Sequence, residues 1–215
     1  MGLNAFLTGL ANLEKIRRAP GFFKYTEHTV AAHSFRVAMI AQTLADIEEL
    51  SGNNINWQTL YEKSLNHDYT ERFICDIKTP VKYANKELRS MLASVEESMT
   101  EAFINQEIPN ELQKIYQRRL SEGKDDTLEG QILSVADKID LMYESYEEIS
   151  KSNPDNVFKD MFFDAVITVK QYRTLSSVEY FFENIFPELI QDDFYGKLSF
   201  QKEIESILND CTSNN

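Results

Sequence analysis

The chain is 215 residues long and carries 35 acidic against 22 basic side chains, a formal net charge of -13. So large an excess of negative charge argues against a nucleic-acid polymer or an anionic membrane as a partner, although a few local cations could still bind a small phosphate. The length fits a single domain, residues 1–215, and such a chain buries about 70% of the surface that it exposes when unfolded. A metal ion would therefore serve chemistry rather than hold the fold together.

Cysteine content and hydropathy indicate a cytoplasmic protein. Cys75 and Cys211 are too few for a disulfide framework. No segment approaches the roughly 18 apolar residues that a membrane span needs, and the N-terminus lacks the pattern of a secretory signal. We therefore expect no association with a membrane.

The spacing of apolar residues predicts an all-α protein. With only seven glycines and five prolines, the chain has few of the residues that favour turns. Apolar residues recur every three or four positions. A first apolar stripe runs from Leu3 to Ile16 and stops at Pro20-Gly21, and the segment 75–85, CDIKTPVKYAN, is expected to be a loop. The further helices are expected at Thr29–Leu50, Trp57–His67, Lys86–Asn105, Asn110–Leu120, Thr127–Ser150, Val157–Arg173, Val178–Ile190 and Phe200–Leu208, with ends set to within about two to four residues.

His33 falls inside the apolar stripe of the second expected helix. At about 100° per residue, Val30, Val37 and Leu44 share a side of that helix with His33, so the imidazole ring should point into the core. A metal ligand would fit this position. A neutral histidine bonded to a buried carbonyl fits as well and is the commoner arrangement for a lone histidine.

Two later helices carry carboxylates on partly apolar faces. Leu60, Tyr61 and Leu65 are expected on the core side of the helix that ends at His67, and Asp68 points into the middle of that side. At this C-terminal end, burial and the helix dipole both disfavour an unpaired negative charge. Asp137 is flanked by Leu133 and Leu141, which give its helix a second face of the kind that lines a cleft. Taken alone, each carboxylate could instead be solvated.

Together, two imidazoles and two carboxylates suit one divalent ion such as Co, Mn, Mg, Fe or Zn. Such an ion would keep positions for water and for a phosphate oxygen, as a hydrolase requires.

The order His33, His67-Asp68, Asp137 resembles the H…HD…D motif of the HD-domain phosphohydrolase superfamily. Within it, the chain is similar to the small bacterial 5'-deoxynucleotidases of the YfbR-like group over about residues 5 to 190. The combination of motifs is more specific than a single His-Asp pair. The segments that carry the resemblance are VAAHSFRVAM at 30–39, HDYTE at 67–71, DIKTPVKY at 76–83 and Ala136-Asp137.

This resemblance implies an all-α HD-domain helical bundle with a metal-binding cleft, a core over about residues 5 to 190 and a C-terminal helical extension. It implies metal-dependent hydrolysis of (deoxy)nucleoside 5'-monophosphates to nucleoside and phosphate. A homodimer is expected on the same grounds.

The resemblance also implies roles for single residues. His33, His67, Asp68 and Asp137 would hold one divalent ion, and Asp68 would share the catalytic centre with Glu71. In the family, the residue that Glu71 matches orients or deprotonates the attacking water. A solvated surface glutamate is the alternative for Glu71.

Substrate contacts are implied for four further residues. Arg18 matches an arginine that binds the substrate phosphate, and Asp76 matches a position near the nucleotide sugar. Thr79 and Lys82 lie in the same loop as Asp76 and are further candidates. An exposed helix-end arginine and a loop-capping aspartate are the structural alternatives for Arg18 and Asp76.

Two departures from the group affect selectivity and metal affinity. Ala19 stands where the group often has a tryptophan packed on the sugar, which puts discrimination between deoxyribose and ribose in doubt. Ala32 stands where a glutamate usually precedes the first histidine, so a contact that supports the ligand is absent.

Other functions stay open on the sequence alone. The chain could be an HD hydrolase of another small nucleotide or phosphate ester, a non-catalytic nucleotide-binding module, or a structural helical protein whose histidines belong to the core. His28 is expected at the surface. A group of phenylalanines could form either a core or a dimer surface: Phe158, Phe162, Phe181, Phe182 and Phe186.

Overall fold

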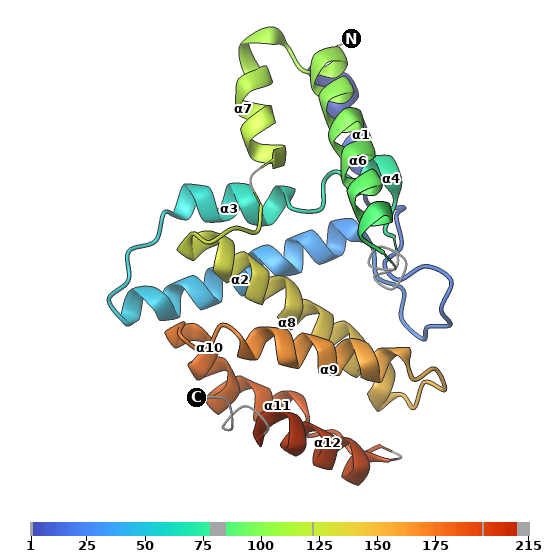
Figure 1. Ribbon diagram of the computed structural model, residues 1–215, viewed down its shortest axis with the longest axis vertical. Helices are drawn as coiled ribbons and strands as arrows, with labels where there is room; N and C mark the ends of the chain where they lie inside the picture. Colours follow the sequence, from blue (N-terminus) through green and yellow to red (C-terminus); the bar gives the residue numbers. More distant parts are fainter. Residues whose placement is uncertain (1, 78–84, 122, 195, 210–215) are drawn as a thin grey trace. The chain divides into compact units, whose positions relative to one another are not determined.

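The computed structural model describes residues 2–77, 85–121, 123–194 and 196–209 (Figure 1). The regular secondary structure of these residues is helical, apart from one isolated antiparallel bridge between Arg17 and Thr29. The prediction of an all-α fold is confirmed. The helices are α1 (Leu3–Gly9), α2 (Val30–Leu50), α3 (Trp57–Asn66), α4 (Glu71–Ile74), α6 (Lys86–Glu107), α7 (Asn110–Ser121), α8 (Leu128–Ser150), α9 (Val157–Lys170), α10 (Ser176–Tyr180), α11 (Phe186–Leu189) and α12 (Lys197–Asn209), with a 3-10 turn at Leu10–Asn12 and a π-helical segment at Phe181–Ile185.

The helices expected from the sequence lie close to those observed, with two informative differences. The first apolar stripe is helical only as far as Asn12, because α1 tightens into the 3-10 turn before the chain leaves the helix. The third helix ends at Asn66 rather than His67, and a new short helix begins at Glu71. None of the helices in the described part of the chain is long and apolar enough to cross a membrane.

Two compact units divide the chain. The first holds residues 1–22, 27–38 and 56–133, and the second holds residues 23–26, 39–55 and 134–215. Helices α2 and α8 contribute residues to both units. A single domain over residues 1–215 stays a prediction.

An aromatic cluster belongs to the core of the first unit and fixes the chain just after residue 68. Tyr69 is 3% exposed, and its ring lies 5.6 Å from that of Phe6 on α1 and 5.7 Å from that of Phe103 on α6. Phe73 on α4 packs on Phe103 at 5.5 Å. The residues next to Tyr69 are therefore held by large apolar anchors, which bury more area than any other side chains.

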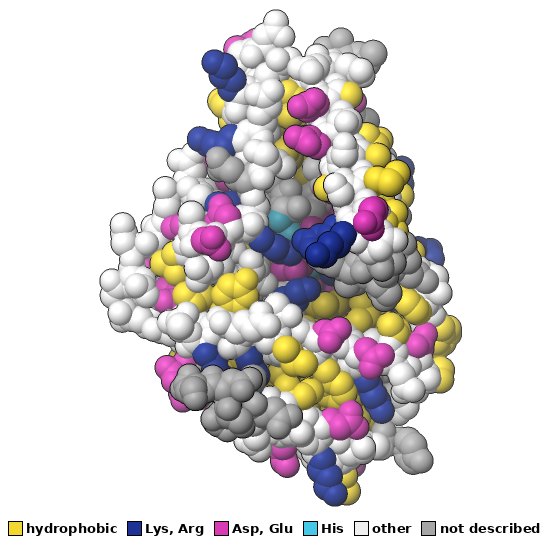
Figure 2. Space-filling view, in the orientation of Figure 1, with side chains coloured by type: hydrophobic (Ala, Val, Ile, Leu, Met, Phe, Trp, Pro, Cys, Tyr) yellow, Lys and Arg dark blue, Asp and Glu magenta, His cyan; other side chains and the backbone are white. Residues whose placement is uncertain are grey.

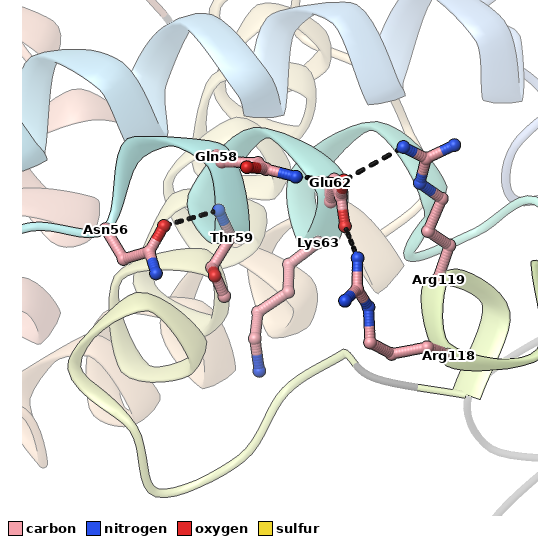
Figure 3. A pocket seen from close by; sticks show the side chains of 7 residues that line it. All are labelled: Asn56, Gln58, Thr59, Glu62, Lys63, Arg118 and Arg119. Carbon is pink, nitrogen blue, oxygen red and sulfur yellow. Dashed lines mark hydrogen bonds and ion pairs between the residues drawn. The ribbon is translucent and has the colours of Figure 1, made fainter. Parts of the chain in front are cut away.

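Helix α7 is tied to α3 in the same unit by an ion-pair network (Figure 3). The carboxylate of Glu62 accepts hydrogen bonds from Arg118 at 2.8 Å and from Arg119 at 2.9 Å. These two arginines, with the side chain of Gln58, hold the pKa of Glu62 at about 2. The buried ammonium group of Lys63 donates to Asp125 and to the carbonyl of Gly123.

The outer surface of α6 carries apolar side chains in the first unit. Figure 2 shows hydrophobic side chains along this helix, at the upper right of the view. Met91, Val95 and Met99 follow one another at a spacing of four residues and are all exposed.

The core of the second unit contains four of the five phenylalanines whose place the sequence left open, whereas Phe182 is only partly buried. Phe158, Phe162, Phe181 and Phe186 are at most 4% exposed. They are core residues. The ring of Phe162 lies 5.2 Å from that of Phe200 on α12 and 6.0 Å from that of Tyr146 on α8.

Buried carboxylates complete the second unit. Glu148 accepts hydrogen bonds from the backbone amides of Tyr25 and Thr26 and from the side chain of Asn153. Glu48 accepts one from the amide of Ser177, at the start of α10. Each carboxylate thus has hydrogen-bond partners that offset the cost of its burial.

We expect Phe162→Ala to lower the free energy of unfolding by about 3 to 5 kcal/mol, because it opens a cavity in a fully buried aromatic cluster. Ile167→Ala on the same helix, where the side chain is 43% exposed, should change it by about 0.5 kcal/mol or less. Chemical denaturation of both variants measures the difference. Equal losses would contradict the assignment of Phe162 to the core.

Candidate metal centre

His33 lies in the first turn of α2, and the start of that helix fixes its direction. The carbonyl of Thr29 accepts from the amide of His33 at 3.0 Å, and its hydroxyl accepts from the amide of Ala32 at 3.3 Å. Thr29 is a common type of N-cap residue, and this one is also held by the bridge to Arg17. The His33 side chain is completely buried, as the sequence predicted.

His67 follows the last residue of α3, and its ring orientation is set by a backbone carbonyl. Its Nδ1 atom lies 2.8 Å from the carbonyl oxygen of Ser64. Because a carbonyl can only accept, Nδ1 carries the proton and Nε2 keeps its lone pair. This is the arrangement that supports metal-ligating histidines in general.

The buried face of α3 differs from the one that the sequence suggested. Lys63 and Ser64 are buried with Leu60, whereas Leu65 is 54% exposed and Tyr61 is 37% exposed. The expectation placed Tyr61 and Leu65 on the core side. It was wrong because the ammonium of Lys63 has partners near residue 125, which removes the usual penalty for burying a lysine.

Three potential ligand atoms from these segments meet at one point in the first unit. Nε2 of His33 lies 3.2 Å from Nε2 of His67, and Oδ2 of Asp68 lies 3.2 Å from the first and 3.3 Å from the second. The three side chains are mostly or fully buried, with exposed fractions of 0%, 2% and 19% for His33, His67 and Asp68.

These separations fit a shared divalent ion. With bonds of about 2.1 Å, neighbouring ligands of one ion lie about 3.0 to 3.4 Å apart, whether the geometry is octahedral or tetrahedral. The tautomer of His67 leaves an unprotonated nitrogen aimed at the same point. The donor set of two imidazoles and a carboxylate can therefore hold a divalent metal.

Charge and hydrogen bonding keep Asp68 ionised. Burial by itself raises the pKa of this carboxyl, but in the metal-free chain hydrogen bonds from His67 and His33, and the charge of these rings when they are protonated, outweigh burial and hold the pKa well below its usual range. Arg18 adds a further cation, with Nη1 at 3.5 Å from Oδ2 of Asp68.

Glu71 is the first residue of α4, and its carboxylate is mostly buried. Residues 67–70 form a separate turn, so Glu71 does not continue α3. Its Oε2 atom is buried without a hydrogen-bond partner among the described residues. Burial, together with the negative charges of Asp68 and Asp76, raises the pKa of Glu71 to about 8.

Arg18 and Asp76 border the same cluster. The amide of Arg18 donates to the carbonyl of His28 at 3.0 Å, next to the bridge between residues 17 and 29. Asp76 accepts at 2.6 Å from the amide of Ala19, whose φ of 45° lies in the left-handed region. The contact favours the loop-capping alternative for Asp76, because it holds a backbone conformation that costs a non-glycine residue free energy.

The remaining candidates belong to the second unit or fall outside the described residues. Asp137 is buried on α8 in the second unit. Thr79 and Lys82 fall outside the described residues. Ala32 is exposed, and His28 is partly rather than fully exposed.

The sequence missed two contacts that orient the cluster. The carbonyl of Ser64 holds His67, and the amide of Ala19 engages Asp76. Both contacts use backbone atoms, which carry no residue-specific signal. Tyr69 could have been found, because an aromatic residue between two polar candidates is itself a sign of an anchored segment.

The fold and the cluster define an HD-domain phosphohydrolase. A solved HD-domain phosphohydrolase from Listeria innocua matches 99% of this chain and 99% of its own, with 50% sequence identity and a TM-score of 0.89. The chain belongs to the YfbR-like family, because the family model described as 5'-deoxynucleotidase YfbR-like matches residues 5–189. The prediction of a phosphohydrolase of this group is confirmed.

A curated relative agrees on the class of protein, and a distant solved structure agrees on the fold. The protein named 5'-deoxynucleotidase YfbR from Escherichia coli O1:K1 / APEC is 26% identical over 183 residues, which cover 85% of this chain and 90% of that one. The cyanophage S-2L HD phosphohydrolase DatZ, solved with dA and one catalytic Zn²⁺, has a TM-score of 0.56, with 93% of this chain and 96% of that chain covered. At 13% identity, this last match shows a shared fold alone.

We expect Glu71→Gln to stabilise the metal-free protein increasingly as the pH rises from about 4.5 to 8. The unfolded carboxyl loses its proton near its ordinary pKa of 4.5, whereas the folded one keeps it up to about 8. In the native chain, the free energy of unfolding is therefore not reduced by this group below pH 4.5. It falls by on the order of a few kcal/mol as the pH rises from 4.5 to about 8. Glutamine does not titrate.

Denaturation with a chelator present, at a series of pH values, measures this effect. The exposed Glu101→Gln is the matched control and should show no pH-dependent gain. A stability difference between Glu71→Gln and the native chain that is the same at pH 5 and pH 8 would contradict the prediction.

Proposed function

We propose that the chain hydrolyses nucleoside 5'-monophosphates, chiefly the deoxy forms, to nucleoside and phosphate with one divalent metal ion. The observation that carries the proposal is the triangle of His33, His67 and Asp68 ligand atoms, 3.2 to 3.3 Å apart. Membership of the YfbR-like family, and a relative named 5'-deoxynucleotidase, support this substrate class.

His33, His67 and Asp68 would hold the ion, with Asp137 as a fourth ligand. A divalent ion would make water more acidic and offset negative charge on the phosphoryl group. The donor set admits Co, Mn, Mg, Fe or Zn. Buried Asp137 comes from the second unit, so this ligand is proposed from the H…HD…D order of the family and from its burial.

Glu71 would take the proton of the attacking water. Its Oε2 atom has no partner among the described residues and can accept a hydrogen bond from a water molecule. A cation nearby lowers the pKa of a carboxyl, which would make Glu71 a carboxylate at neutral pH. The water oxygen would then bond to phosphorus as the bond from phosphorus to O5' breaks, and O5' would take a proton from Glu71 or from solvent to leave as the nucleoside hydroxyl.

Arg18 would bind the substrate phosphate. Its guanidinium lies beside Asp68, and its side chain is 13% exposed. The planar fork of donors in arginine suits two oxygens of a phosphate dianion. Since Asp76 holds the backbone at Ala19, we assign Asp76 a positioning role for the segment that carries Arg18. Thr79 and Lys82 remain candidates for substrate contact from the family motif.

Selectivity for the sugar is expected to be weak. Ala19 has a methyl group where the group often has a tryptophan, so less apolar surface is available to pack on deoxyribose. Ribonucleoside monophosphates, or another small phosphate ester, are therefore the second class of substrate to test. A homodimer and a cytoplasmic location are also proposed, on family grounds and from the cysteine content.

Phosphate release from a panel of deoxy- and ribonucleoside 5'-monophosphates tests the proposed function. We expect no release after chelation, and recovered release when Co, Mn, Mg, Fe or Zn is added back singly. Deoxynucleotides should be preferred by about tenfold or less, because the loss of one packing contact is worth about 1 to 2 kcal/mol. The absence of release with every metal and substrate would overturn the proposal.

Glu71→Gln separates an enzyme from a nucleotide-binding module. The variant should bind metal and nucleotide as the native chain does, while turnover falls by about 100-fold or more. Binding is measured by calorimetry and turnover by phosphate release. Unchanged turnover would exclude the role assigned to Glu71.

Asp137→Asn tests the fourth ligand. Loss of a residue that merely supports a ligand costs about 10- to 100-fold in metal affinity, so loss of a direct ligand should cost about 100-fold or more. Competition with a fluorescent chelator measures the affinity, and the exposed Asp164→Asn is the control. Equal affinities of both variants would remove Asp137 from the site.

A further inference from the structure

A second concave region lies on α3, among residues that the proposed reaction does not use. It consists of two adjoining cavities of the first unit, which share Gln58, Glu62 and Arg119 in their lining. We name the whole region the α3–α7 pocket. The first cavity, which is mainly polar, has a volume of about 190 Å³, and the second has a volume of about 400 Å³.

The polar half of the α3–α7 pocket presents two guanidinium groups. Figure 3 shows Arg118 and Arg119 reaching from α7 toward Glu62 on α3. Each guanidinium contacts Glu62 through one nitrogen, Nη2, at 2.8 and 2.9 Å. Two cations against one carboxylate leave one net positive charge, in a chain whose formal charge is -13.

One donor in this half has no acceptor. The Nε atom of Arg119 is buried, and no hydrogen bond reaches it from the described residues. A buried N–H without an acceptor is costly, and native proteins usually satisfy such a donor. An oxyanion placed beside Arg119 would supply the missing acceptor.

The other half of the α3–α7 pocket is mainly apolar and aromatic. Its walls include Phe6, Tyr61, Leu65 and Tyr116. The guanidinium of Arg119 lies 5.7 Å from the ring centre of Tyr116, so a cation and an aromatic face meet where the two halves join. A flat ring can stack on such walls, and base stacking on aromatic side chains tolerates any nucleobase.

From these observations we propose that the α3–α7 pocket binds a nucleoside 5'-phosphate, with its base against Tyr61 and Tyr116 and its phosphate at Arg118 and Arg119. His33, His67 and Asp68 line neither cavity, so this site is distinct from the metal cluster, although Asn66 at the C-terminal end of α3 lines the apolar half. The simpler alternative is that the arginines serve only to clamp α7 on α3.

Trp57 reports on occupancy of the pocket. It is the one tryptophan of the 215 residues, and its ring lies 5.8 Å from that of Tyr61. The probe is the phosphonate analogue of dAMP, in which carbon replaces the bridging oxygen and hydrolysis is impossible. We expect a saturable change of Trp57 fluorescence when the metal-loaded protein is titrated with this probe.

Arg119→Lys and Tyr61→Leu each test one half. Lysine keeps the charge but loses the Nε donor and the fork, and leucine keeps apolar contact but loses the ring. Both should raise the dissociation constant measured by Trp57 by about tenfold, with thermal unfolding unchanged. Arg173→Lys is the matched control, because this arginine also lies over an aromatic ring, that of Phe182 in the second unit.

The controls separate the pocket from the metal centre and from simple anion binding. Arg18→Ala should leave the Trp57 change intact. A change that Arg18→Ala abolishes and Arg119→Lys does not would place the nucleotide at the metal centre and overturn the proposal. Inorganic phosphate that binds as tightly as the phosphonate would also overturn it, as would a signal that never saturates.

Discussion

The close approach of two imidazole nitrogens and one carboxylate oxygen is the constraint on which the chemistry of this protein depends. Nε2 of His33 and Nε2 of His67 lie 3.2 Å apart, with Oδ2 of Asp68 at nearly the same distance from each. Two nitrogen lone pairs at this distance do not stabilise each other, whereas a cation bound between them would be stabilised by both. The surrounding helices keep these atoms in place.

Local structure positions each member of the cluster by a different device. His33 takes its direction from the first turn of α2, which Thr29 caps. His67 takes its ring orientation from the carbonyl of Ser64. Asp68 is held through its neighbour Tyr69, because the ring of Tyr69 is buried in the aromatic core. Stability of the first unit and geometry of the site therefore rest on the same segment.

Helix α3 links two kinds of polar site. Its C-terminal end leads into His67 and Asp68, and its outer face carries Glu62, which two arginines of α7 engage. The two sites differ in their electrostatics. The ligands at the metal cluster are buried, with Arg18 beside Asp68, whereas the α3–α7 pocket has partly exposed guanidinium groups and aromatic walls. This contrast suits a metal ion and the reacting phosphate at the first site and a second, unreacting nucleotide at the other.

The sequence by itself determined the helices, the burial of His33 and the motif that marks the family, since helical periodicity and residue type are local properties. Tertiary structure decided the rest. Burial of Lys63 in place of Leu65 depends on Asp125, and the function of Asp76 at Ala19 depends on a backbone amide 57 residues away. The start of α4 at Glu71, after a separate turn, follows from the packing of Tyr69 and Phe73 on Phe103. Each of these outcomes requires a partner that is distant in the chain, and periodicity along one helix contains no information about such a partner.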